Sequence, residues 1–179
     1  LNYIKNSNAT SYNTRFMDGY FQYEQTWTLI QPAVEFMASR LNANFKTKQS
    51  SGLVVHARGG DFLQDRESNE HQLKFYEKVI SNGDIPEFKS GKLCCSDPSY
   101  GEKIVRKFEE FGINLKYDPK EDGDWQDDFS LIKDAKFVVG SRSTFAWWAT
   151  VLGQTKSVFP CDFTIGKQRV LFHPWETVY

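Results

Sequence analysis

The sequence predicts an α/β fold built on a doubly wound parallel sheet, Rossmann-like in kind. Short apolar runs alternate with segments of helical periodicity along most of the chain. The apolar runs show no polar alternation, as expected of strands that helices cover on both faces. Each intervening segment is long enough for a right-handed crossover between parallel strands. The chain has 179 residues, the size of one ordinary domain at roughly 150 residues per domain.

Five strands are predicted from the apolar runs at residues 51–57, 92–95, 113–117, 137–139 and 157–159. Helices are predicted between them from apolar spacing at residues 73–80, 104–111, 129–135 and 143–153. Ser143 is expected to cap the last helix at its N-terminus. Glycines are expected to close three of these helices, namely Gly83 (after Asn82), Gly112 and Gly153.

An amphipathic helix is also predicted ahead of the first strand. Its apolar face consists of Trp27, Ile30, Val34, Met37 and Leu41, and Pro32 falls in its early turns. Residues 1–18 are rich in Asn, Ser, Thr and Tyr and are interpreted as a lead-in or linker stump. Residues 19–179 are interpreted as one Rossmann-like domain.

Composition excludes several classes of function. Lys and Arg number 22 against 23 Asp and Glu, which argues against a nucleic-acid coat or a polybasic membrane binder. No apolar run approaches the length of a membrane span. The cysteine count is odd and Cys94 adjoins Cys95, so no disulfide framework is expected. That fits a reducing compartment, and a cytoplasmic location is the expectation. Three Cys and three His show no ligand spacing, so no structural zinc is expected.

Candidate functional residues follow the strands, because ligands of open parallel sheets bind outside the carboxyl ends of the strands. The first strand ends in the segment His56–Asp61, whose two glycines permit a tight turn. Arg58 carries a planar fork of donors suited to a phosphate, and His56 can donate or accept a hydrogen bond. An ordinary turn with a surface arginine and an N-capping Asp61 explains the segment equally well.

Two further loops are candidates. Ser96-Asp97-Pro98 follows the second strand, and a helix start with a Ser or Asp cap is sufficient to explain it. The hydroxyl-rich turn 140–145 follows the fourth strand and opens a helix, whose free N–H groups and dipole favour an anion. Arg142 adds positive charge there. The simpler interpretation of Ser143 is an ordinary N-cap.

Residues 118–128 hold six acids, among them the triplet Asp122-Gly123-Asp124. Some glycosyltransferases bind a metal and a nucleotide diphosphate through such a DxD triplet. A solvated surface loop is the better interpretation of so short a pattern. The glycine-rich dinucleotide and P-loop fingerprints are absent, as is the nucleophile elbow of the hydrolases.

Taken in order, these motifs resemble those of the α-1,2-fucosyltransferases, glycosyltransferase family 11. The family's HxRRGDY, FSDD-like and NSTFSWW-like segments match His56–Phe62, Cys95–Pro98 and Arg142–Trp148. A GYWQ-like segment matches Gly19–Gln22, and an acid ahead of the penultimate strand matches Asp128 within the segment 127–131. The ordered set is more specific than any one motif.

The resemblance implies similarity to the C-terminal, nucleotide-sugar-binding half of a GT-B glycosyltransferase. Such an enzyme is inverting and metal-independent, and transfers L-fucose from GDP-fucose to a glycan hydroxyl, commonly the 2-OH of galactose. The implied partners are GDP-fucose and a glycan acceptor, with no cofactor beyond the donor substrate. The family's N-terminal half, which helps to build the acceptor site, has no counterpart in this sequence and is a further expected partner.

The resemblance also assigns roles to residues. Arg58 matches the arginine that grips the diphosphate and is the expected catalytic residue, while His56 lies against the nucleotide. Asp128 matches the acid that binds guanine, and Ser143 and Thr144 match a phosphate-contacting hydroxyl pair. The remaining expected contacts to GDP-fucose are Ser96, Asp97, Arg142 and Phe145.

Two departures from the family pattern concern charge and hydroxyls. Gly59 stands where the family has a second arginine, and Arg142, where the family has asparagine, is a candidate to restore that charge. Ala146 replaces a serine. A non-catalytic GDP-sugar-binding module with a degenerate HxRRxD motif is therefore the main alternative. A metal-dependent transferase using Asp122 and Asp124 is a third.

Overall fold

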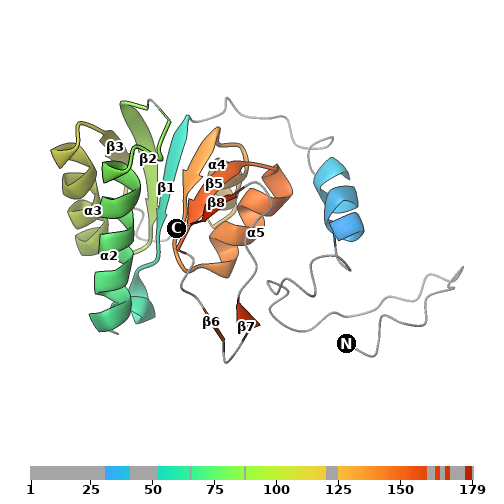
Figure 1. Ribbon diagram of the computed structural model, residues 1–179. Coiled ribbons are helices and arrows are strands. Elements are labelled where there is room, and N and C mark those ends of the chain that lie inside the picture. Colours follow the sequence, from blue (N-terminus) through green and yellow to red (C-terminus); the bar gives the residue numbers. More distant parts are fainter. Residues whose placement is uncertain are drawn as a thin grey trace, which may run out of the picture.

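The computed structural model describes residues 31–40, 52–64, 66–86, 88–119 and 125–160, together with three short strands closer to the C-terminus. Its central feature is a parallel sheet flanked by helices (Figure 1). The fold class predicted from the sequence, an α/β doubly wound parallel sheet, is therefore confirmed.

The sheet has the strand order β3-β2-β1-β4-β5-β8, and every neighbouring pair within it is parallel. The five predicted strands are β1 (Leu53–Ala57), β2 (Ser90–Cys95), β3 (Asn114–Tyr117), β4 (Phe137–Val139) and β5 (Lys156–Phe159). The sixth, β8 (Glu176–Val178), was not predicted, and neither was the antiparallel pair β6 (Thr164–Ile165) and β7 (Gln168–Arg169).

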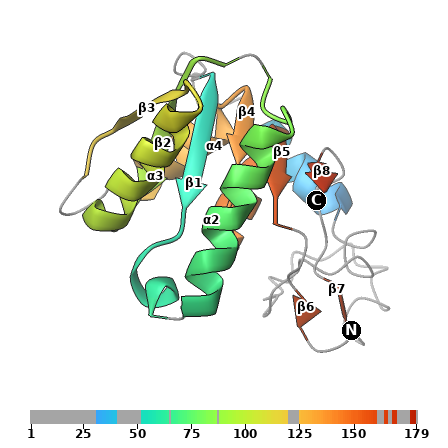
Figure 2. The same ribbon diagram turned by 60° about the vertical axis from the view of Figure 1, so that its left-hand side comes forward.

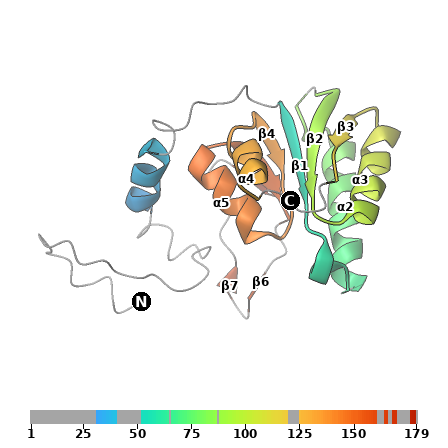
Figure 3. The ribbon, with the colours of Figure 1, turned by 180° about the vertical axis from the view of Figure 1, so that it is seen from behind.

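The connecting helices are α2 (Arg66–Ser81), α3 (Pro98–Glu110), α4 (Trp125–Lys133) and α5 (Thr144–Gly153), with a short 3-10 helix, η1, at Gly60–Leu63. Helices α2 and α3 cover one face of the sheet, and α4 and α5 cover the other (Figures 2 and 3). Among the residues that the structure describes, no helix is long and apolar enough to cross a membrane.

The strand β1 shows why both faces must be covered. Leu53 and Val55 belong to the core beneath α2 and α3, whereas Val54 belongs to the core beneath α4 and α5. All three are fully buried. Cys94 and Cys95 divide in the same way between the two cores. The prediction that these neighbours point to opposite faces is confirmed.

Helix ends follow the predicted chemistry with one correction. Asp97 caps α3 and accepts from the Tyr100 amide, while Ser143 caps α5 and accepts from the Ala146 amide. Gly112 takes the left-handed conformation expected of a helix stop. Gly153 does not, because α5 continues through it and Gln154 becomes the left-handed cap.

The predicted N-terminal helix is present over residues 31–40. Val34 is buried in the core beneath α4 and α5. Met37, expected on the same face, is 41% exposed, and Ala38 is buried in its place. Trp27, Ile30 and Leu41 lie outside the described residues, as do the lead-in 1–18 and the GYFQ segment.

Candidate functional site: a cavity at the topological switch point

The strand order reverses its direction of growth between β1 and β4. From β1 the chain builds outward through β2 and β3, and then returns to place β4 on the other side of β1. Ligands of open α/β sheets bind at this reversal, beyond the carboxyl ends of the strands. Arg58 lies in the loop after β1, and the turn 140–145 follows β4. The two main candidate motifs of the sequence therefore lie at this reversal.

A cavity of about 450 Å³ lies at these strand ends, within the usual range for small-molecule sites. It is lined by the β1 loop, the end of β2, Asp118 after β3, and the first turns of α4 and α5. Of the predicted site residues, those that line it are His56, Arg58, Ser96, Asp128, Ser143 and Phe145. Asp97, Arg142 and Thr144 adjoin the lining residues in sequence but do not belong to the lining.

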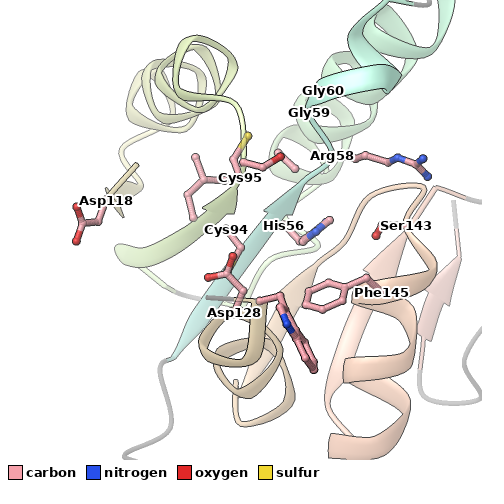
Figure 4. A pocket seen from close by; sticks show the side chains of 14 residues that line it. His56, Arg58, Gly59, Gly60, Cys94, Cys95, Asp118, Asp128, Ser143 and Phe145 are labelled. Carbon is pink, nitrogen blue, oxygen red and sulfur yellow. The ribbon is translucent and has the colours of Figure 1, made fainter. Parts of the chain in front are cut away.

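Charge is unevenly distributed in the cavity. Figure 4 shows Arg58 and Ser143 on one side of His56, with Asp118 and Asp128 on the other. Ser143 is the N-cap of α5, and the unsatisfied N–H groups and the dipole at this helix end favour negative charge. One end therefore suits an anion, and the other suits a group that donates hydrogen bonds.

The end of β1 and the loop that follows it are joined to the loop after β4 by two hydrogen bonds. His56 Nδ1 lies 2.8 Å from Ser141 Oγ, and the Arg58 guanidinium donates to the Arg142 carbonyl at 3.2 Å. Arg142 thus contributes its main chain to the position of Arg58. These two hydrogen bonds hold the residues at the cationic end of the cavity in place by linking the two sides of the switch point.

Helix α2 also holds this segment, through hydrogen bonds to the main chain of His56 and Arg58. The Tyr76 hydroxyl donates to the His56 carbonyl at 2.7 Å. The buried Gln72 amide donates to the Arg58 carbonyl at 3.3 Å and to the Tyr100 hydroxyl at 2.7 Å. The backbone at both residues is therefore held independently of any ligand, which reduces the ordering cost of binding.

The imidazole of His56 is neutral at physiological pH. Burial and, to a smaller extent, the nearby positive charge of Arg58 lower its pKa from 6.5 to about 4. Its ring packs 6.1 Å from that of Phe145, which in turn meets Phe129 edge-on. His56 therefore contributes a neutral hydrogen-bonding group rather than a second cation.

Gly59 is tightly packed against the start of α3. A Cβ built at this position would lie 2.6 Å from the Asp97 Cβ and 3.2 Å from the Asp97 amide nitrogen. The Asp97 carboxylate is occupied in capping α3, and the hydrogen bonds from Tyr100 and Ser99 lower its pKa. The simpler interpretation of Ser96-Asp97-Pro98 as a helix start is confirmed, and any contact of Asp97 with a ligand stays a prediction.

The structure adds lining residues that sequence reasoning did not select. Trp125 is 64% exposed and lines the cavity one helical turn before Asp128. Asp118 follows β3 and belongs to the acidic run 118–128, for which the sequence favours a solvated surface loop. Cys95 also lines the cavity, where burial raises the pKa of its thiol to about 11. The position of Asp118 after a strand was a usable signal, since the carboxyl ends of parallel strands share one edge.

Metal binding was the third interpretation of the sequence. Asp122 and Asp124 lie outside the described residues. Over the ranges that the structure describes, no group of three or more His, Cys, Asp or Glu side chains is arranged to hold a metal ion.

The fold and the site together define a Rossmann-like domain with a polar cavity at its switch point. No known family profile matches the chain, and no curated protein matches it. Among solved structures, POFUT1 in complex with GDP is similar over 76% of this chain and 50% of its own, with 16% identity and a TM-score of 0.45. The heptosyltransferase WaaC of E. coli with ADP covers 79% of this chain and 41% of its own, with 19% identity and a TM-score of 0.48. The chain thus spans half or less of the length of these proteins.

Proposed function

We propose that this chain is the donor-binding part of an inverting, metal-independent fucosyltransferase that uses GDP-fucose. The acceptor in this proposal is a glycan hydroxyl, the 2-OH of galactose. The supporting observation is the cavity at the switch point, with Arg58 and the α5 N-terminus at one end and Asp118 and Asp128 at the other. The ordered HxRxGD, SD and STFxWW motifs point to the same activity.

The cationic end suits a diphosphate. The Arg58 guanidinium offers five N–H donors, and its hydrogen bond to the Arg142 carbonyl orients it before any ligand arrives. Ser143 accepts from the Ala146 amide as an N-cap, and its hydroxyl still has a proton to donate. The amides of Thr144 and Phe145 belong to the first turn, before intrahelical bonding begins at the Trp147 amide. Together these groups form a ready anion site.

The acidic end suits guanine. A carboxylate accepts two hydrogen bonds from the N1–H and N2–H groups of guanine, a pair that uracil does not present. Asp128 lines the cavity, and Trp125 lies one turn earlier on the same side of α4. The exposed indole offers a flat apolar surface beside that carboxylate. In this arrangement Asp128 selects the base.

The chemistry follows from the position of Arg58. In the transfer step the bond between fucose C1 and the β-phosphate oxygen breaks, and its electron pair leaves with GDP. The acceptor oxygen bonds to C1 from the opposite face and releases its proton to solvent, so that the products are the fucoside, GDP and one proton. Negative charge grows on the β-phosphate in the transition state, where Arg58 and the α5 N-terminus stabilise it.

The alternative is a GDP-sugar-binding module without catalysis. Gly59 favours it, because the family's second arginine is replaced and Asp97 fills the space that a side chain there would need. Turnover separates the two proposals. Hydrolysis of GDP-fucose, or transfer of fucose to lactose, supports the enzyme, whereas GDP binding with no turnover supports the module.

Calorimetric titration with GDP in the presence of EDTA tests the nucleotide site. A separate titration with UDP is the control for recognition of the base. GDP is expected to bind, UDP to bind far more weakly, and Arg58→Ala to lose most of the affinity. Arg106→Ala is the matched control, since that arginine is 77% exposed on α3 and pairs only with Glu102 in the described structure. If neither nucleotide binds, or if both arginine variants behave alike, the proposal is wrong.

A further inference from the structure

We infer that Ser141 is a positioning residue for His56: its hydroxyl donates to Nδ1, so that the Nε2–H of the imidazole is the donor presented to the cavity. The significance of that donor rests on the proposed function, in which the cavity holds a diphosphate. The assignment of the tautomer rests on the geometry alone.

The contact joins His56, near the end of β1, to the loop after β4, across 85 positions in the sequence. Ser141 directly follows Gly140 at the end of β4 and is 1% exposed. Its Oγ lies 2.8 Å from His56 Nδ1, a normal length for a hydrogen bond between these atoms. With Nδ1 engaged, Nε2 is the ring nitrogen left for a ligand, and His56 lines the cavity.

The direction of the hydrogen bond follows from what each alternative leaves unpaired. If Nδ1–H donated to Ser141, the serine proton would be buried, and among the described residues the hydrogen bond to His56 is the one that the Ser141 hydroxyl makes. A buried donor without a partner is costly, whereas a hydroxyl oxygen with an unused lone pair is common. The favoured arrangement therefore has Ser141 donating and the proton of His56 on Nε2.

This tautomer suits an anionic ligand. A bare Nε2 would turn a lone pair toward phosphate oxygens beside Arg58, and the two groups would repel each other. An Nε2–H instead adds a neutral donor to the charged donors of Arg58. Ser141 thus acts on the ligand through His56, without contacting the ligand itself.

The test measures the imidazole ¹⁵N chemical shifts of the histidines in the wild-type chain at pH 7. The chain has three histidines, and His56→Gln assigns the signal of interest. The expected pattern is a protonated Nε2 and an unprotonated Nδ1. A proton on Nδ1 would overturn the inference, and this reading does not depend on any Ser141 variant folding.

Substitutions at Ser141 then show whether this residue acts through its hydrogen bond to His56 or only by filling space. Ser141→Ala is expected to shift His56 toward a mixture of tautomers and to weaken GDP binding about two- to tenfold, the range for one hydrogen bond. Ser141→Thr keeps the hydroxyl and is expected to restore the wild-type tautomer. Ser157→Ala is the matched control, because Ser157 is equally buried on β5 and its Oγ has no hydrogen-bond partner among the described residues.

The outcomes distinguish this inference from the proposed function. The expected tautomer without GDP binding supports the role of Ser141 and contradicts the proposed function. GDP binding with an unchanged tautomer in Ser141→Ala contradicts the inference and leaves the proposed function standing.

Discussion

The contact between Gly59 and Asp97 yields a quantitative prediction about stability. Gly59→Ala would place a Cβ 2.6 Å from the Asp97 Cβ, whereas carbon atoms in contact sit at about 3.5–4.0 Å. The overlap is about 1 Å with a residue that itself begins α3. Relief requires the β1 loop or the start of α3 to move, and both are held by hydrogen bonds.

The expected loss of stability is about 1–3 kcal/mol, the usual cost of adding a methyl group to a well-packed site. At about 2–4 °C per kcal/mol for a chain of this size, Tm falls by about 2–12 °C. Urea denaturation followed by circular dichroism measures the same loss as a free energy.

A double-mutant cycle isolates the contact. Asp97→Gly removes the offending Cβ, and glycine is itself tolerated at an N-cap at a cost of a few tenths of a kcal/mol relative to the polar caps. The pair Gly59→Ala and Asp97→Gly is therefore expected to be more stable than the sum of the single changes predicts, by about 1 kcal/mol or more. Gly60→Ala is the control, because its Cβ meets nothing within 4 Å and its cost comes from a φ of +63°.

Additivity of the Gly59 and Asp97 changes to within about 0.5 kcal/mol would show that the two sites are independent and that no close contact couples them. Coupling of Gly60→Ala to Asp97→Gly as strong as that of Gly59→Ala would likewise contradict a contact specific to Gly59. In either case the close approach at Gly59 would not be what limits this position.

Three further predictions concern titration and charge. The pKa of His56 lies at about 4 in the folded chain, against 6.5 for the free side chain, so the unfolded state takes up a proton first as the pH falls. Stability is expected to decrease between pH 6.5 and 4 by up to about 3 kcal/mol, and His56→Gln is expected to flatten this part of the urea-midpoint profile. Cys95, with its thiol pKa raised to about 11 by burial, is expected to react with iodoacetamide at pH 8 much more slowly in the folded chain than in urea, as peptide mapping would show. Arg142→Ala is expected to weaken GDP binding several-fold at low salt and less at high salt, and an unchanged affinity in calorimetry would contradict a charge role for that side chain.

The sheet was predictable because its strands are buried on both faces. A run such as Leu53–Ala57 then consists of apolar residues throughout, and the helical spacing between such runs supplies the crossovers. The strand β8 was missed because Glu176–Val178 has three residues and begins with an acid. Gly153 was misjudged for a different reason: a glycine near a helix end predicts a stop, but hydrogen bonding within α5 carries the helix one residue further.

The candidate site was predictable only in part. Side chains in the loops after the strands, such as Arg58 after β1 and Ser143 after β4, could be placed at one edge because parallel strands share their carboxyl ends. The partners of those side chains could not be placed. The His56–Ser141 bond crosses 85 positions, and no local pattern marks either residue as the other's neighbour.

At Arg142 and Gly59, main-chain contacts and packing matter as well as the charge of the side chain. The family resemblance interprets Gly59 as a lost cation and Arg142 as a candidate to restore it. In the structure the Arg142 carbonyl already accepts from Arg58, a contact that any residue at that position could make. Gly59 in turn is enclosed by the residue that caps α3. A second arginine after Arg58 would therefore require α3 to begin differently. The absence of a side chain at position 59 and the capping of α3 by Asp97 thus depend on each other.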